Sequence, residues 1–489
     1  MAENMNVDTK HPLYTEFHPE YKLVSDCVAG ERRIKAGTTL YLPRVSSWED
    51  QRYLNYMLRA RFMNGTGRTL SALIGIAMEK PLGINMDSQF DYLREDSDGK
   101  GKSITQLFRD ALSQNLQKGR GGILLDNTAI NDGEYMIGER TIAQNSKERW
   151  VLRHFDATHI INWRTVNGKL SLLVLKYHEE VETEGFEHEP ITIWLEYRMK
   201  GGLCYGRIWK SPPGVTTPTA VVLGTGEAET DLIPLSIKGK ALDHIPFAWY
   251  GSENNDEIPD TPPLADLARL NVGHYQADAD IAESAFQAGQ PTITISGLSE
   301  AWAKNFMKKG VEVGSTEAVL LPANAKMDIV QAKETTASTK RQEALESQMA
   351  KMGAKFIERG AGNRTATQAS DEAQTDNSIL SQCVGNVEAA INLALSWVSA
   401  GEITANKRFV AIQVDSQALV AMMSAVQANL MTIEDFVRWQ QQIGLADPNA
   451  TVEQIVTQLR NQVIDLPDSD FTDVTDKNAK TTTEEDDAE

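Results

Sequence analysis

The sequence predicts an α+β fold in which helices and an antiparallel sheet occupy separate stretches of a 489-residue chain. Three observations support this prediction. Apolar residues recur about every 3.6 positions in the first third of the chain and in three long segments after residue 260. Between residues 122 and 250, short runs rich in β-branched and aromatic residues alternate with turns. Asn167-Gly168 and Gly201-Gly202 are turn pairs of the hairpin type between such runs.

Three helices are expected in the first third of the chain. The first covers Trp48–Met63, where apolar and aromatic side chains share one face. The second covers Leu70–Met78. The third covers Ile104–Leu116, with Ser103 as its N-cap and a stop near Gly119.

The middle of the chain is expected to form one meandering antiparallel sheet. Its runs are short, and turn residues separate them. The expected strands are Gly122–Leu125, Trp150–Phe155, Leu170–Tyr177, Ile191–Met199 and Leu203–Trp209.

Two long helices with a small insert between them follow the sheet. Thr261 is expected to cap the first helix, which stops at Gly289, and the second covers Ser338–Arg359. The insert is expected to hold a helix and three strands, at Ser299–Lys309, Thr292–Ser296, Ala318–Leu321 and Met327–Val330. The pattern alone leaves two interpretations open: a stalk that carries a small knob, or two ordinary core helices of a large domain.

The C-terminal part is expected to be mostly helical. A glycine- and threonine-rich loop at Gly360–Thr367 precedes a long helix at Ser370–Ala400 and a short strand at Phe409–Val414. A helical bundle is expected over Gln417–Gln462, with Thr432 capping one of its helices. The last 25 residues hold ten acids and two lysines, a net charge of −8, which predicts disorder.

Composition excludes several classes of protein. The chain has 68 acidic and 48 basic residues, a formal charge of −20, which argues against tight wrapping of nucleic acid. Its three cysteines are far apart and odd in number, so neither a disulfide framework nor a cysteine zinc site is expected. The apolar run Leu70–Met78 is about half the length that a membrane span needs. Common cofactor, metal and hydrolase motifs are missing, so no cofactor, metal or catalytic residue is assigned.

Titratable residues are scattered along the chain. His154 and His159 flank an expected strand end and could meet in space, but a packed or surface histidine is the simpler interpretation of each. Cys383 is expected to act as a small buried hydrophobe. An acid-dependent hydrolase in the Gly122–Tyr250 region remains an alternative, and a cleft with paired carboxylates would indicate it.

A line of basic residues follows the second long helix. Lys351, Lys355 and Arg359 are spaced at i, i+4 and i+8, so they cover about 12 Å of one face, and Arg364 continues the line into the next loop. Such a line could contact a phosphate backbone. Alternatively it is a solvated face that pairs with glutamates of the same helix, namely Glu343, Glu346 and Glu358.

Several segments, taken in order, resemble one family. They are "HPEYKLVSDCVAGERRIKAGTTLYLPR", "RARFMNGTGRTLSALIGIAMEKP", "PPLADLARLNVGHYQADADIAESAFQAGQPTITISGL", "AVLLPANAKMDIVQ" and "QEALESQMAKMGAKFI". Together they resemble portal (head-to-tail connector) proteins of tailed bacteriophages, of a group defined by an uncharacterised domain. The likeness extends over about Pro12–Ala400.

The resemblance implies a function. Portal proteins form a ring, typically of twelve subunits, at one capsid vertex, and double-stranded DNA passes through the ring during packaging and ejection. The expected partners are other copies of the chain, the large terminase subunit, head–tail adaptor or tail proteins, and the major capsid or scaffolding protein. The protein would assemble in the host cytoplasm and reside in the virion, with no membrane association. It would have no catalytic centre, since ATP hydrolysis belongs to the motor.

The resemblance also divides the chain into parts. They are an N-terminal wing (1–262), stem helix 1 (263–289), a clip (290–333), stem helix 2 (334–359), a channel loop and wing helix (360–404), a helical crown (405–464) and the acidic tail (465–489). The basic line would then contact DNA in the channel. Because so small an insert cannot bury its own apolar faces, its strands are expected at subunit contacts. The residues concerned are Ile293, Ile295, Val319, Leu320 and Leu321. Another head-structural protein, such as a scaffold or minor capsid component, is the alternative.

Overall fold

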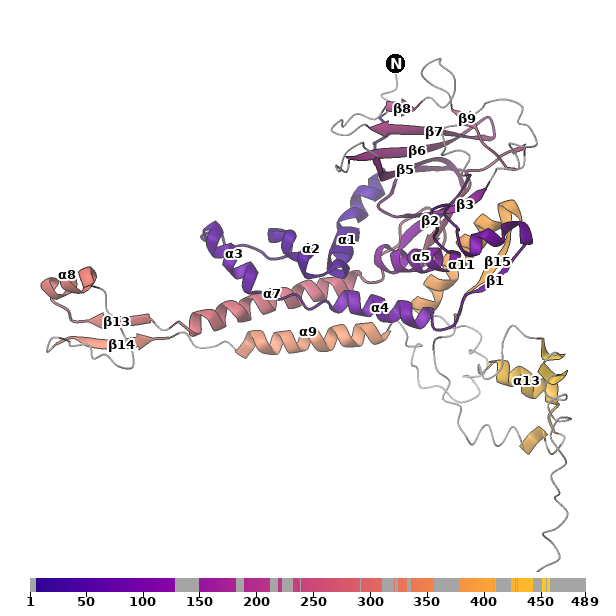
Figure 1. Ribbon diagram of the computed structural model, residues 1–489. Coiled ribbons are helices and arrows are strands. Elements are labelled where there is room, and N and C mark those ends of the chain that lie inside the picture. The colour runs from indigo at the N-terminus through magenta and orange to yellow at the C-terminus, as the bar shows by residue number, and fades with distance from the viewer. Residues whose placement is uncertain are drawn as a thin grey trace, which may run out of the picture. The chain divides into compact units, whose positions relative to one another are not determined.

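The computed structural model in Figure 1 describes residues 6–127, 149–181, 189–211, 219–221, 232–237, 239–290, 292–309, 321, 324–331, 336–355, 378–407, 409, 424–426, 428, 430–442, 451–453 and 455–457. The chain divides into two compact units, Met1–Phe409 and Val410–Glu489. Within the described ranges, no helix is long and apolar enough to span a bilayer. The first unit combines helices with antiparallel sheets, so the predicted α+β class is confirmed.

The N-terminal third is helical, as predicted. Its helices are α1 (Pro12–Ala29), α2 (Glu31–Ala36), α3 (Asp50–Arg59), α4 (Gly65–Ala77) and α5 (Ile104–Lys118), with 3-10 turns η1 (Thr38–Leu40) and η2 (Ser88–Arg94). The predicted cap of α5 is confirmed, because Ser103 and Gln106 form a reciprocal capping box. Gly119 ends α5 in the left-handed conformation. Helices α1 and α2 are additional to the predicted set.

The predicted single meander is wrong, because its strands form two larger sheets. One has the order β12-β2-β3, from Phe247–Gly251, Arg120–Asn127 and Trp150–Asp156. After β3, a tight turn at Asp156–His159 leads the chain into the second sheet. There the carboxylate of Asp156 accepts the backbone N–H of Thr158 at 2.8 Å, which closes the turn.

The second sheet contains the last three predicted strands, which pair in sequence order as a meander. Its order is β4-β5-β6-β7-β8, with bounds Ile160–Val166, Lys169–Val181, Glu189–Lys200, Leu203–Ser211 and Thr219–Val221, and β9 (Ile233–Pro234) also pairs with β7. Both predicted hairpin turns are present. Asn167, Gly168, Gly201 and Gly202 all have positive φ, as two-residue turns of this kind require. A small ribbon of β10 (Ser236–Ile237) and β11 (Lys240–Ala241) follows.

Helix α11 (Ile379–Val398) forms the centre of the core of this unit. It packs on α5, β2 and β12, and β15 (Gly401–Thr404) then pairs with β1 (Gly83–Met86). Ser378 is in the extended conformation and caps the helix through its side chain, so the predicted start at Ser370 is wrong, and 370–377 lie outside the described residues. Cys383 is fully buried in α11, as predicted.

All three cysteines of the chain are buried and free. Burial raises the pKa of each thiol, Cys27, Cys204 and Cys383, to about 12. They are therefore unreactive thiols near neutral pH.

The two long helices are α7 (Ala265–Ala288) and α9 (Thr336–Lys355). Between them lie β13 (Thr292–Ser296), α8 (Glu300–Lys309) and β14 (Lys326–Val330). The predicted cap at Thr261 is wrong: α7 begins later, with Leu264 at the N-cap position. A turn in which the Ala265 N–H donates to the Pro262 carbonyl at 3.0 Å precedes the helix, so both prolines stay outside it.

In the second unit the structure describes α13 (Ile433–Gln442) and short neighbouring pieces. The hydroxyl of Thr432 accepts the Asp435 N–H at 3.1 Å, which confirms the predicted cap. Of the strand predicted at Phe409–Val414, only Phe409 is described, and it is not in a strand. The rest of that strand, much of the predicted bundle, the loop at Gly360–Thr367 and the acidic tail lie outside the described residues.

Candidate functional site

The long helices α7 and α9 pack side by side and antiparallel. As the residue number increases along α7, the number of the residue opposite it on α9 decreases. His274 Nε2 lies 3.0 Å from Glu346 Oε1, and Gln342 Nε2 donates to Asp278 Oδ1 at 3.4 Å. These two pairs are one helical turn apart along each helix. A polar seam therefore fixes the register of the helix pair.

Helix α9 is buried along one narrow stripe only. Its half-buried or buried positions before the C-terminal turn alternate in steps of four and three, a heptad spacing. They are Ser338, Gln342, Leu345, Met349 and Met352. Among the described side chains of α9, Met349 alone is buried. The rest of the helix faces away from α7.

The insert between the helices is a two-stranded hairpin with one helix. β13 and β14 are antiparallel, with Ile293 opposite Ile329 and Ile295 opposite Met327. At the base, the Gln331 side chain donates to the Ala288 carbonyl at 2.6 Å. Ile329 and Val330 are 66% and 58% exposed.

The strand predicted at Ala318–Leu321 is described only at its last residue. Of the predicted strands of the insert, Thr292–Ser296 and Met327–Val330 are present as β13 and β14, which pair with each other. Leu321 is described and is not in a strand, while Val319 and Leu320 lie outside the described residues. β14 alternates polar and apolar residues from Lys326 to Ile329, which suits an exposed two-stranded ribbon.

The basic line is described only at its start. Lys351 is exposed on the side of α9 away from α7, and it makes no ion pair with a described residue. Lys355 is the last residue of α9, and its side chain lies outside the described residues, as do Arg359 and Arg364. Of the glutamates that could neutralise the line, Glu346 instead faces His274.

Helix α3 packs against α7 from a second side, a contact that we did not predict from the sequence. The Tyr56 hydroxyl donates to Asp280 Oδ1 at 2.6 Å, and the Arg61 backbone N–H donates to Asp278 Oδ2 at 2.7 Å. Arg59 pairs with Glu283. The C-terminal half of α7 is rich in acidic residues, and the segment at and after α3 is rich in arginine. These complementary charges are the sequence signal that could have predicted this contact.

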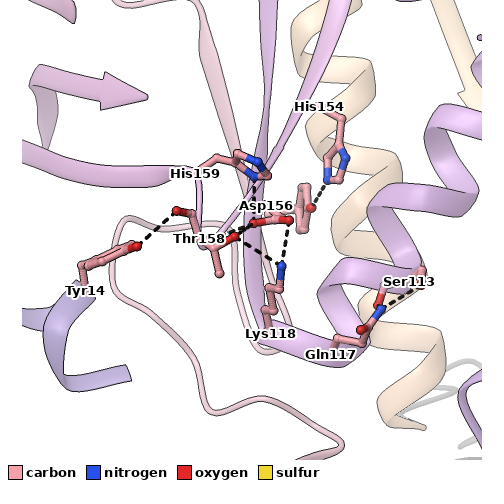
Figure 2. Close-up of polar contacts among 9 residues, drawn as sticks. Tyr14, Ser113, Gln117, Lys118, His154, Asp156, Thr158 and His159 are labelled. Carbon is pink, nitrogen blue, oxygen red and sulfur yellow. Dashed lines mark hydrogen bonds and ion pairs between the residues drawn. The ribbon is translucent and has the colours of Figure 1, made fainter. Parts of the chain in front are cut away.

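Titratable side chains also converge at the junction of α5 with the two large sheets (Figure 2). Lys118 Nζ lies 2.7 Å from Asp156 Oδ2, and the Thr158 hydroxyl donates to Asp156 Oδ1 at 2.5 Å. His159 Nδ1 lies 3.0 Å from Asp156 Oδ1. Tyr14 on α1 donates to the Thr158 carbonyl at 3.2 Å.

The two histidines predicted to flank this strand end have different partners. His154 Nε2 lies 2.5 Å from the Tyr250 hydroxyl, while His159 faces Asp156 (Figure 2). Burial lowers the pKa of His154 to about 4, so this ring is neutral at physiological pH. His154 is therefore a packed histidine, whereas the His159 side chain is 40% exposed, and both fit the predicted packed or surface interpretation.

The electrostatics of the junction are those of a structural ion pair. Burial alone would raise the pKa of Asp156, but the contact with His159 and the charge of Lys118 hold it well below the usual range. A general acid at neutral pH needs the opposite shift. This cluster therefore ties α1, α5 and the turn between β3 and β4 together.

The other buried carboxylates of the sheets also have cationic partners. Asp126 lies 3.0 Å from Arg153, and Glu196 lies 2.9 Å from Arg207. The side chains of Trp209 and Arg198 also donate to Glu196. Within the described part of the chain, no three histidine, cysteine or acidic residues are grouped as metal ligands. These contacts give the hydrolase alternative no support.

Comparisons with known proteins add two findings. A family model described as "Domain of unknown function (DUF4055)" matches residues 263–400, a range that includes both long helices, the insert and α11. No curated protein matches the chain.

Among solved structures, the chain is similar to one in "Virion of native gene transfer agent (GTA) particle". The two are 13% identical with a TM-score of 0.37, over 81% of this chain and 94% of that one. Another similar chain is in "Neck of empty GTA particle computed with C6 symmetry", at 13% identity and a TM-score of 0.37, over 82% and 96%. These TM-scores are too low to assign a shared fold.

Proposed function

We propose that this chain is the subunit of a phage portal: a homo-oligomeric ring in the virion, at one capsid vertex, that conducts double-stranded DNA during packaging and ejection. In this proposal α7 and α9 are the stem, the β13–α8–β14 insert is the clip, and the first unit around α11 is the wing. The clip and stem present the docking surface for the terminase motor and for adaptor or tail proteins. The proposal assigns no catalytic step to this chain.

One observation supports the proposal above the others: α9 buries a single stripe against α7. A core helix of a large domain would be covered on most of its surface. Here the described side chains outside the stripe are exposed over nearly the whole helix. This favours the stalk interpretation over two ordinary core helices, and the ordered resemblance of the quoted segments to portal proteins gives the stalk its function.

The clip also fits a subunit that is completed by its neighbours. An isolated two-stranded hairpin is marginally stable in water. In β14, Ile329 and Val330 are exposed, and both strands have an unpaired edge within the described part of the insert. We therefore keep Ile293 and Ile295, together with these two residues, as candidates for the subunit contact.

Ring assembly is the direct test. Purified protein should form a closed ring of about twelve subunits, about 650 kDa for a chain of 54.1 kDa, with a central channel. Mass photometry gives the mass and negative-stain imaging gives the channel. A strictly monomeric protein at all salt and protein concentrations would contradict the proposal. An assembly without a channel would favour another head-structural role.

The basic line gives a second test, of the DNA path. Replacing Lys351, Lys355 and Arg359 together by Gln should leave the ring intact but reduce DNA packaging or retention, because three potential phosphate contacts are lost. Packaged DNA per particle is the measurement, with Lys200→Gln at the exposed end of β6, outside the stem and clip, as a single-lysine control. Unchanged packaging would return these residues to the solvated-surface interpretation.

A further inference from the structure

A short acidic loop connects β12 to α7. We define the acidic loop as residues 253–260, which carry Glu253, Asp256, Glu257 and Asp260 and no basic residue. Arg120, buried behind the loop, offsets part of this charge. Ile258 points outward and is 58% exposed. Glu253 is exposed, Asp256 and Glu257 are half-buried, and Asp260 is buried. An exposed isoleucine in a loop with these carboxylates gives the surface both an apolar and an electrostatic component.

Hydrogen bonds hold the acidic loop in one conformation. The carboxylate of Asp260 accepts the backbone N–H of Glu253 at 2.8 Å, and that of Asp256 accepts the N–H of Ile258 at 2.8 Å. Two further bonds tie the loop to α11: Asn255 donates to the Asn386 carbonyl at 3.0 Å, and Gln382 donates to the Glu253 carbonyl at 2.6 Å. The loop is therefore preorganised, which reduces the entropy lost when it binds a partner.

A surface of opposite character lies on α2 and α3. Residues 31–68 hold eight basic and three acidic residues, a net charge of +5 in a chain of −20. Within it, Leu54 and Leu58 are one turn apart on α3 and are 41% and 60% exposed. Lys35 Nζ donates to the Leu58 carbonyl at 3.4 Å, so the end of α2 lies beside this leucine. We call this the basic-apolar surface.

The basic-apolar surface has charges that are not neutralised by neighbours. Four exposed arginines make no ion pair with any residue that the structure describes. They are Arg32, Arg33, Arg61 and Arg68. Arginine together with exposed leucine is typical of protein interfaces, whereas contacts to a nucleic-acid backbone use cations and polar groups.

The acidic loop and the exposed leucines of α3 lie far apart within one chain. The acidic loop precedes the start of α7 and is bound to α11, whereas α3 is fixed to α7 at Asp278–Glu283. Thirteen or more residues of straight helix, about 20 Å, separate Ala265 from the first of these contacts. Figure 1 shows α3 over the C-terminal half of α7 and α11 beyond its other end.

We propose that the acidic loop of one subunit docks on the basic-apolar surface of the next. Ile258 packs against Leu54 and Leu58, and the exposed loop carboxylates face the unpaired arginines of the basic-apolar surface. The contact joins two different faces, so it is heterologous and propagates from copy to copy until it closes into a ring. The inference rests on the proposed function and deepens it, by naming where neighbouring subunits touch.

Cysteine cross-linking tests this contact directly, because the natural cysteines are all buried. Leu58→Cys and Ile258→Cys are made in separate preparations and mixed, and each is also treated alone with a short bismaleimide. The mixture should give a cross-linked dimer at least tenfold above either variant alone. Val166→Cys, at a 52% exposed apolar position on β4, replaces Leu58→Cys in the control mixture and should give none.

The outcomes separate this inference from the proposed function. Rings without the Leu58–Ile258 cross-link would overturn the contact and leave the portal proposal standing. Cross-linked open chains without rings would support the contact and count against the portal proposal. Equal cross-linking of either variant with itself would indicate a symmetric contact and overturn the heterologous one.

A charge-reversal pair provides an independent measurement. Glu253→Lys with Glu257→Lys should abolish assembly, and so should Arg33→Glu with Arg61→Glu, since each places like charges across the contact. The two variants mixed should form mixed oligomers, because each supplies the face that the other has lost. Failure of the mixture to associate more than either variant alone would contradict the proposal, as would full assembly of each variant by itself. Loss of DNA binding without loss of assembly would show that the surface binds nucleic acid instead.

Discussion

Gly121→Ala is expected to destabilise the first unit by about 3 kcal/mol, the upper end of the range of about 1–3 kcal/mol that is typical of overpacking a rigid core. Gly121 on β2 lies opposite Tyr250 on β12, and a Cβ at this position would overlap the phenol oxygen and ring. Tyr250 is fully buried and its hydroxyl contacts His154, so the ring has nowhere to move. The free energy of unfolding from urea titration is the measurement.

Gly75→Ala is the matched control for this substitution. Gly75 lies inside α4, and a Cβ there would meet nothing within 4 Å. Alanine is the better helix former, so this variant should gain about 0.5–1 kcal/mol. Similar values for the two variants would mean that Tyr250 does not occupy the space beside β2.

The sequence predicted correctly those helices and turns whose caps, terminating glycines or turn residues lie within the element itself. Helix α5 is an example, since Ser103 and Gln106 cap it within one turn and Gly119 ends it. The two hairpin turns are others, because Asn-Gly and Gly-Gly accept positive φ without strain. The apolar period of about 3.6 residues likewise predicted the long helix α9, although its observed start precedes the predicted Ser338 by two residues.

The rest depends on partners that are distant in the sequence. The split into two sheets follows from the Asp156 turn, and Asp156 is fixed by Lys118, 38 positions earlier. Helix α1 was not predicted because its buried side chains are interspersed with many polar ones, so the sequence shows only a weak helical period of apolar residues. The role of the acidic loop and the contact of α3 with α7 were not predicted for the same reason, because both depend on where α7 lies in the folded chain.

Lys118→Met is expected to cost about 3–5 kcal/mol near neutral pH, since it leaves a buried carboxylate without its cation. The Lys118 and Asp156 side chains are only 8% and 12% exposed, so solvent screens their attraction little. Methionine preserves most of the length and the apolar stem of lysine, so the packing loss is small. Urea unfolding of the wild type and the variant gives the difference.

The pH dependence identifies the ion pair as the cause. In the wild type the pKa of Asp156 is lower folded than unfolded, so its contribution to stability is present above the unfolded value of about 3.9 and lost as the pH falls through the folded value. In Lys118→Met, burial without the cation raises the pKa of Asp156, and the carboxyl becomes neutral at a higher pH. The difference in unfolding free energy between the wild type and Lys118→Met should therefore be largest near pH 7 and become smaller towards about pH 4.

Lys304→Met, which removes the exposed ion pair with Glu300, should change stability little at any pH. A Lys118→Met penalty that stays constant with pH would mean that packing, rather than charge, holds α5 to the Asp156 turn.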